Sequence, residues 1–341
     1  MELMNRVFMM RFGLGVLCVV IFVAVIFSLP TLLAINIHHE QERAFSAMKE
    51  QFPVTVNPKE KIIVENAQVN AFLESSNSPL QAAAGSVENA FGSVFAWVAM
   101  AIADAPLYQS IASAEGRFVS ITAGMRKEQV ANAFAKTLGW NTKQKKEFLT
   151  APPYSSLPLP EGSFFPGIYL VENGTPPLTA QALVNERFSE NILSRYGPET
   201  AQIVPLNQAL TVASLIEREA GGPDDMRIIS GIIWNRLFIN MNLQIDATLQ
   251  YAKANTSATN SWWPKPLPLD RFRKSPYNTY LNKGLPPTPI ASPSVASVLA
   301  ALNPKNTSCI FYFHDSLGGF HCSDTYAEHV ALLKKYYGRG K

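Results

Sequence analysis

The chain has 341 residues, of which 47% are hydrophobic and 16% are charged, and its formal net charge is +3. This composition is sufficient for a globular core and excludes a disordered tail protein, which would carry a larger charged fraction. The Lys and Arg residues form no dense block, so we expect no nucleic-acid partner.

An uncharged segment, residues 12–37, lies close to the N-terminus and follows Arg6 and Arg11. It is longer than the ~20 residues that a helix needs to cross a bilayer. Because positively charged flanks stay on the cytoplasmic side, we expect residues 1–11 in the cytoplasm and residues 12–37 to be a single transmembrane signal anchor. The rest of the chain would then be periplasmic (extracytoplasmic), held at the cell inner (cytoplasmic) membrane. A cleaved signal peptide is the alternative, and the length of the segment argues against it.

Residues 38–114 form a membrane-proximal region whose fold the sequence leaves undefined. Residues 54–64 alternate enough for a short strand. A second apolar run, over residues 89–102, is too short to span a bilayer comfortably. We therefore expect it to be a helix that is buried in the protein or lies at the membrane surface.

From residue 115 to residue 341, strands and helices are mixed without regular alternation, which predicts an α+β fold. Asn207 is the expected N-cap of a central helix, and Gly221 and Gly222 are expected to end it. The expected strands are 117–121, 168–171 and 310–313. The expected helices are 126–138, 179–196, 208–220, 223–238, 294–302 and 323–337.

Two of the cysteines, Cys309 and Cys322, flank a predicted turn at residues 317–319. Counted back from this turn, they would not lie directly opposite each other on a hairpin, so the register argues against a disulfide. The chain shows no spacing typical of metal ligands, and we expect no metal site.

The helix predicted over residues 208–220 carries two glutamates that point in different directions. Glu219 falls on an apolar stripe between Val212 and Leu215, whereas Glu217 points almost the opposite way. Burial disfavours a charged carboxyl, so a glutamate on the apolar stripe has the environment of a general acid. The alternative is that one of the two glutamates pairs with an arginine and holds helices together.

The same helix carries the first of several motifs that resemble a known family. The run Ala213-Ser214-Leu215-Ile216-Glu217-Arg218-Glu219 resembles the Ala-Ser-Ile-Val-Glu-Lys-Glu signature of the endolytic murein transglycosylases, the YceG/MltG family. One departure is Ala247, which stands where the family commonly has proline. Further motifs follow in the family's order: Trp234 to Leu237, Met241 to Thr248, Ser275 to Tyr280, Gly284 to Pro287 and Ile290 to Asn303.

The resemblance implies an enzyme that cuts peptidoglycan glycan strands without a cofactor. By its place in the motif, Glu219 would protonate the glycosidic oxygen between N-acetylmuramic acid and N-acetylglucosamine. It would then accept the proton of the muramyl C6 hydroxyl, which leaves 1,6-anhydro ends. Peptidoglycan synthases are the protein partners that trimming of nascent strands would imply. The catalytic core would span residues 161–341, with residues 115–160 as a candidate remnant of the family's LysM-like domain.

The resemblance also assigns roles to polar motif residues around Glu219. Three of these expectations have structural alternatives: Asn278 as a turn residue, Asn235 as a partner of buried backbone, and Arg236 as an ion-pair partner of Glu217. Glu217 and Arg236 are expected to be supporting residues in either case. The expected substrate-binding residues are Gln244, Asp246, Asn235, Tyr277 and Asn278.

Two other functions stay open on the sequence. A lysozyme-type hydrolase would need a second carboxylate, for which Asp246 is the only candidate within the motifs. An inactive wall-binding scaffold is the other alternative. The lack of a recognisable binding domain in residues 41–110 favours a scaffold, and the intact motif around Glu219 disfavours it.

Overall fold

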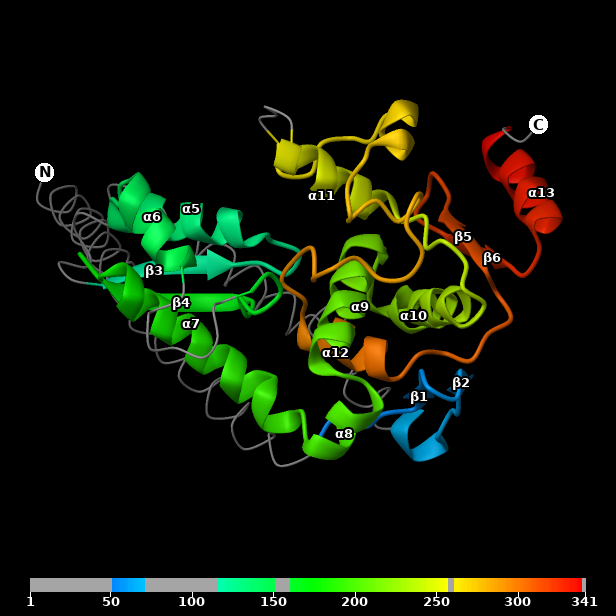
Figure 1. The fold of residues 1–341 in the computed structure, drawn as a ribbon, viewed down its shortest axis with the longest axis horizontal. Coiled ribbons are helices and arrows are strands. Elements are labelled where there is room, and N and C mark those ends of the chain that lie inside the picture. Colours follow the sequence, from blue (N-terminus) through cyan, green and yellow to red (C-terminus); the bar gives the residue numbers. More distant parts are fainter. Residues whose placement is uncertain (1–50, 71–115, 151–159, 257–260, 339–341) are drawn as a thin grey trace, which may run out of the picture.

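A computed structural model describes residues 51–70, 116–150, 160–256 and 261–338 of the chain (Figure 1). The predicted signal anchor and the apolar run over residues 89–102 lie outside these ranges. Within them, no helix has the length and apolar character needed to cross a membrane. The described elements are two-stranded antiparallel sheets and a larger number of helices, which confirms the mixed α and β class.

The centre of the molecule is a group of helices. Helix α9 (Leu206–Glu219) packs against α12 (Val295–Leu302) and α10 (Pro223–Phe238) (Figure 1). Val212 and Leu215 are fully buried, as the apolar stripe of this helix predicts. The helix that carries Glu219 is therefore packed into the larger of the two hydrophobic cores that the described residues form.

Some helix boundaries differ from the sequence expectation. Helix α9 begins at Leu206 after an extended Pro205, so Asn207 lies inside the first turn and the expected N-cap was wrong. The extended backbone of Pro205 sets the start of the helix, and no side chain caps it. Helix α7 (Pro177–Asn191) also ends before the expected residue 196, because a 3₁₀ turn, η1 (Leu193–Arg195), follows it.

A second body with its own core lies beside the central helices. Strand β3 (Gly116–Ile121) pairs along its whole length with β4 (Gly167–Glu172), and α5 (Lys127–Leu138) and α6 (Thr142–Leu149) pack with them and with α7. Strand β3 lies before residue 160 and β4 lies after it. The pairing therefore joins the two segments, 115–160 and 161–341, that the sequence suggested as separate parts. The core of this body is rich in aromatic side chains: Phe134, Trp140, Phe148, Phe164 and Tyr169.

The C-terminal part is a hairpin followed by a helix. Strand β5 (Phe311–His314) pairs with β6 (Phe320–Ser323), and α13 (Tyr326–Tyr337) closes the chain. Cys309 and Cys322 form a disulfide with a Cα–Cα distance of 5.8 Å, so the expectation against it was wrong. Cys322 does lie opposite Tyr312 rather than Cys309, but Cys309 precedes β5 and lies outside the strand register that the expectation assumed.

The remaining elements are short or were not foreseen. The alternating run over residues 54–64 contains two paired strands of two residues each, β1 (Val56–Asn57) and β2 (Ile62–Ile63). Helix α8 (Pro198–Ile203) leads into α9. Helix α11 (Asp246–Thr256) and the 3₁₀-helix η2 (Pro268–Phe272) lie together along one side of the central helices (Figure 1).

Candidate active site

Glu219 is the last residue of α9, and its side chain is held from two other parts of the chain. Its Oε2 atom accepts a hydrogen bond of 2.9 Å from the hydroxyl of Tyr312 on β5. Its Oε1 atom accepts a longer one, 3.4 Å, from the backbone N–H of Ala247 in the first turn of α11. Three segments that are far apart in the sequence therefore meet at this carboxyl.

The surroundings of Glu219 favour its protonated form. Burial raises the pKa of the Glu219 carboxyl above its ordinary value, and the hydrogen bonds from Tyr312 and Ala247 lower it by less. Its position at the negative end of the α9 dipole disfavours the carboxylate as well. A carboxylic acid that keeps its proton toward neutral pH can act as a general acid.

Tyr312 is a site residue that the sequence did not reveal. Burial raises the pKa of the Tyr312 hydroxyl well above its ordinary value, and the neighbouring Glu219 raises it further. The hydroxyl therefore stays neutral and donates its proton to Oε2. Neither the helical wheel nor the quoted motifs include β5, so no signal in the sequence pointed to Tyr312.

Asp246 and Gln244 lie beside Glu219, on the segment that leads into α11. Asp246 is exposed, and its Oδ1 atom accepts a hydrogen bond of 2.7 Å from the hydroxyl of Tyr280. Gln244 is also exposed and has a left-handed backbone with φ of 52°. Its N–H donates to the carbonyl of Thr279 at 3.1 Å. The structure thus places these two expected substrate-binding residues on the segment that contacts the candidate acid through Ala247.

The loop after α9 is closed against β5 by a second pair of side chains. His314 Nε2 and Asp225 Oδ2 lie 2.5 Å apart, and Asp225 also accepts the backbone N–H groups of Gly221 and Gly222. A Cβ atom added at Gly221 would meet His314 Nε2 at 3.1 Å, so a side chain here would crowd the imidazole. This pair fixes the turn immediately after Glu219.

The sequence matches a profile of the YceG-like family over residues 94–335. The chain belongs to the YceG-like family. It is 31% identical over 239 residues to the endolytic murein transglycosylase of Bacillus subtilis, and the match covers 64% of each chain. Over 162 residues it is 30% identical to the endolytic murein transglycosylases of two Streptococcus pneumoniae strains, which covers 47% of this chain and 29% of theirs.

A solved structure agrees with the family assignment. The crystal structure of a YceG-like protein from Listeria monocytogenes superposes on this fold with a TM-score of 0.55 and a sequence identity of 25%. The superposition covers 66% of this chain and 80% of the other. This chain spans only part of the length of its curated relatives.

Glu217 lies on the other side of α9 from Glu219 and has a different set of partners. Its Oε2 atom accepts from the backbone N–H of Ser294 at 2.9 Å, and from the hydroxyls of Ser294 and Ser297 at 2.7 and 2.6 Å. Ser294 is the N-cap of α12. Glu217 therefore supports the structure, because its carboxylate links α9 to the start of α12.

Arg236 has backbone partners instead of the alternative ion pair with Glu217. Its Nε atom donates to the carbonyl of Ile310 at 2.7 Å, and its Nη1 atom donates to the carbonyl of Leu243. The first carbonyl directly precedes β5 and the second directly precedes Gln244. Arg236 therefore supports the site by joining the two segments that contact Glu219 from either side.

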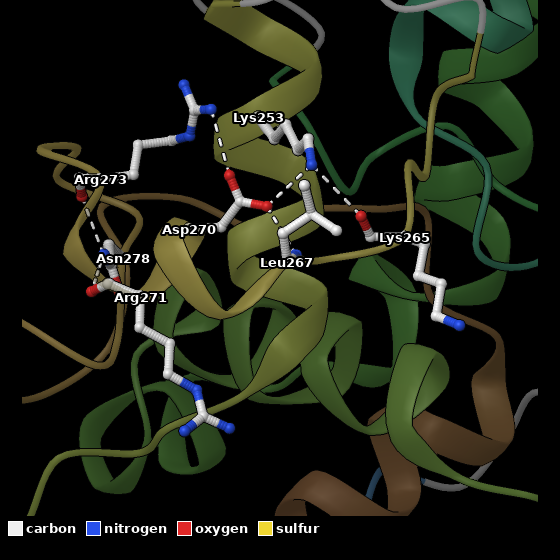
Figure 2. Close-up of polar contacts among 7 residues, drawn as sticks. All are labelled: Lys253, Lys265, Leu267, Asp270, Arg271, Arg273 and Asn278. Carbon is white, nitrogen blue, oxygen red and sulfur yellow. Dashed lines mark hydrogen bonds and ion pairs between the residues drawn. The ribbon is translucent and has the colours of Figure 1, made fainter.

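Two of the expected substrate-binding residues have internal partners instead. Asn278 is fully buried, and its side-chain amide donates to the carbonyls of Arg271 and Arg273 at 3.0 and 2.8 Å (Figure 2). Asn235 donates its amide to the carbonyl of Thr307 at 2.7 Å. These contacts correspond to the structural alternatives that the sequence left open, with Asn278 as a turn residue.

Tyr277 is half-buried and lies within a cluster of aromatic rings. Its hydroxyl lies 2.8 Å from that of Thr288, and its ring centroid lies 4.7 Å from that of Tyr251. The exposed part of the ring is available for contact with a ligand, but its polar atom already has a partner. Across the residues that the structure describes, no group of three or more His, Cys, Asp or Glu side chains could hold a metal ion.

Proposed function

We propose that this chain is an endolytic lytic transglycosylase that cleaves the β-1,4 bond between N-acetylmuramic acid and N-acetylglucosamine in peptidoglycan. Membership of the YceG-like family and the names of its relatives support the substrate and the reaction. The observation that carries the residue assignment is the single carboxyl of Glu219, whose pKa is raised by burial and which Tyr312 orients.

The proposed reaction uses Glu219 twice. Glu219 first donates its proton to the glycosidic oxygen, and the bond from this oxygen to C1 of N-acetylmuramic acid breaks. The C6 hydroxyl of the same sugar then attacks C1, and its proton passes to the Glu219 carboxylate. The products are a free 4-hydroxyl on N-acetylglucosamine and a 1,6-anhydro ring on N-acetylmuramic acid. The acid is restored and no water is consumed.

Tyr312 would position Glu219 through both steps. Because its hydroxyl donates to Oε2, the transferable proton is more stable on Oε1. After the proton has left, the same hydrogen bond stabilises the carboxylate, and bonds to a charged acceptor are the stronger kind. Tyr312 therefore favours Oε1 as the oxygen that carries the proton. It also stabilises the form of the enzyme in which Glu219 is ionised, after the first proton transfer.

Gln244 and Asp246 are the best-placed residues for binding the glycan beside Glu219. Both are exposed on the segment next to the acid, and their side chains can hydrogen-bond sugar hydroxyls and acetamido groups. A hydrolase would need Asp246 to activate water or to trap the sugar. Asp246 instead accepts the Tyr280 hydroxyl, which favours a binding role over that of a free base.

We also propose that residues 12–37 anchor the chain in the cytoplasmic membrane and that the catalytic part lies outside the cytoplasm. The uncharged length of this segment and the two arginines before it support this orientation. The Cys309–Cys322 disulfide suits an oxidising compartment. Such a location would place the enzyme beside the synthases that make its substrate.

A digest of purified peptidoglycan sacculi tests the proposed activity. The full chain in detergent and its Glu219→Gln variant are incubated with sacculi, and the soluble products are identified by mass spectrometry. We expect internal cleavage with anhydromuramic ends for the wild type and none for the variant. Reducing ends in place of anhydro ends would indicate a hydrolase. Glycan binding without cleavage by either protein would indicate a scaffold.

A further inference from the structure

Residues 261–283, between α11 and Gly284, expose both apolar and basic side chains. Large apolar side chains are exposed here, including Leu269 at 79%, Phe272 at 73% and Leu267 at 58%. Basic side chains are exposed among them. We define the loop face by its exposed members: Trp262, Lys265, Leu267, Leu269, Arg271, Phe272, Lys274, Leu281 and Lys283.

The geometry of η2 separates an outer side from an inner side. In a 3₁₀-helix, side chains three residues apart lie one above the other. Leu269 and Phe272 therefore share the outer side, whereas Asp270 and Arg273 share the inner side. The exposures agree, because Asp270 is only 6% exposed. The apolar side chains thus project as a pair from a short, well-defined helix.

The inner side of the loop is held by a buried carboxylate (Figure 2). Asp270 accepts a hydrogen bond of 2.8 Å from Lys253 Nζ on α11, one of 2.7 Å from the N–H of Leu267, and one of 3.2 Å from Arg273. Residues 261–283 contain five basic residues and one acidic residue, and that acidic residue is Asp270. Burial of Asp270 leaves the loop face with positive charge and no negative charge of its own.

We infer that the loop face docks on the surface of a lipid bilayer that contains anionic phospholipids. Exposed apolar patches of this kind mark interaction sites. Leucine side chains have no aromatic face on which a sugar could stack, so Leu267 and Leu269 favour lipid over glycan as the occupant. Insertion of apolar side chains at the headgroup level, with lysine and arginine around them, is the pattern of proteins that bind anionic membranes.

The loop face adjoins the candidate active site. The Arg271 guanidinium lies over the ring of Tyr280, at 5.1 Å from its centroid, and the Tyr280 hydroxyl binds Asp246. Docking of the loop face would therefore hold Asp246 and the neighbouring Glu219 close to the lipid headgroups, where the membrane-proximal end of a glycan strand is within reach. This consequence depends on the proposed function, whereas the lipid contact itself does not.

The lipid contact can be measured with a fluorophore that reports its surroundings. Leu269→Cys is labelled with a nitrobenzoxadiazole group in the full chain, with Cys18→Ala so that this cysteine does not react. The protein is placed in nanodiscs of phosphatidylcholine alone or mixed with phosphatidylglycerol, and brominated lipids serve as quenchers. We expect quenching to be at least about threefold stronger in the discs with phosphatidylglycerol, and to fall at about 1 M salt, where charges are screened within ~3 Å.

Matched variants separate the loop face from other exposed surfaces. A label at Leu178→Cys, an exposed leucine of α7, should show little quenching in either disc. The variant Lys265→Gln with Lys274→Gln and Lys283→Gln should lose most of the quenching at position 269. The variant Lys136→Gln with Lys143→Gln and Lys146→Gln, which removes the same charge from α5 and α6, should not. Both triple variants should cleave solubilised sacculi at the wild-type rate.

Three results would overturn the inference. Quenching at position 269 no stronger than at position 178 would show that the loop face does not meet lipid. A blue-shifted label without lipid quenching would show that a protein segment covers it. Equal quenching in discs with and without phosphatidylglycerol would remove the role of the basic residues. None of these results depends on whether Glu219 is catalytic.

Discussion

Two glutamates on one helix, Glu217 and Glu219, have opposite environments. Glu217 accepts three short hydrogen bonds from Ser294 and Ser297, so its carboxylate charge is spread over well-placed donors. Glu219 is half-buried and accepts one good hydrogen bond and one long one. The motif contains the same residue type at both places, and the tertiary neighbours decide which glutamate joins two helices and which has a raised pKa.

The largest expected effect is the loss of cleavage activity when Glu219 is replaced, which distinguishes it from Glu217. Glu219→Gln removes the proton donor and should lower the cleavage rate by ~10²- to 10⁴-fold, the usual contribution of a general acid. Thermal stability should be unchanged or slightly higher, since a half-buried carboxyl is replaced by a neutral amide. The rate on sacculi and the thermal midpoint are measured on the same preparation. A variant that keeps wild-type activity would remove Glu219 from the mechanism.

Tyr312→Phe tests whether the environment of Glu219 matters as well as the residue. Loss of a hydrogen bond to an ionised group should slow cleavage by ~10- to 100-fold, from ~1.5 to 3 kcal/mol. The Tyr312 hydroxyl lowers the pKa of Glu219, so its removal should move the high-pH fall in activity to higher pH. A pH–rate profile checks both effects. An unchanged profile would mean that Tyr312 has no influence on the proton of Glu219.

Glu217→Gln should produce the opposite pattern, with a loss of stability and a smaller loss of activity. The variant weakens the link between α9 and the N-cap of α12, and should cost ~1 to 3 kcal/mol in the free energy of unfolding. Urea denaturation measures this cost. If Glu217→Gln instead removed activity and left stability unchanged, the assignment of the two glutamates would have to be exchanged.

Asp270 extends the comparison to a third carboxylate that has many donors. Its hydrogen bonds with Lys253, Leu267 and Arg273 lower its pKa to about 2, although burial acts in the other direction. A carboxyl whose pKa is depressed in the folded state contributes stability above its unfolded pKa of ~3.9 and loses it as the pH falls through the folded value. Asp270→Asn should therefore be less stable at neutral pH, and the difference should shrink between about pH 4 and pH 2.

The smallest expected effect concerns Ala247, which stands at the proline position of the motif that the sequence resembles. Ala247→Pro removes the N–H that reaches Glu219 at 3.4 Å, and proline is tolerated in the first turn of a helix. Because this hydrogen bond also lowers the pKa of Glu219, its removal should move the high-pH fall in activity to higher pH, and only slightly because the contact is long. If the activity of Ala247→Pro instead fell at lower pH than that of the wild type, the Ala247 N–H would not be lowering the pKa of Glu219.

Several parts of this arrangement could be predicted from the sequence. The helical wheel placed Glu217 and Glu219 on different sides of α9, and it did so correctly because both directions depend on one local period. Helices α10 and α12 and the C-terminal hairpin were also expected close to their observed positions. These features depend on patterns within 10 to 20 neighbouring residues, which a single sequence displays.

The partners of these side chains could not be predicted in the same way. Tyr312 lies 93 residues from Glu219, and its contact depends on how β5 packs against the end of α9. For Arg236 the sequence left an ion pair with Glu217 open, but its side chain binds two backbone carbonyls, which periodicity does not reveal. The role of Asn278 depended on whether its side chain is free to bind substrate or binds the backbone of its own loop. Each of these outcomes follows from tertiary packing.

The most direct test of the account is a digest of sacculi by the full chain in water enriched with ¹⁸O. If Glu219 acts as acid and then as base, the C6 hydroxyl is the nucleophile and no atom of water enters the products. The account predicts anhydromuramic ends, detected by mass spectrometry, without ¹⁸O. Reducing ends that each carry one ¹⁸O atom would contradict it and would show that the enzyme activates water.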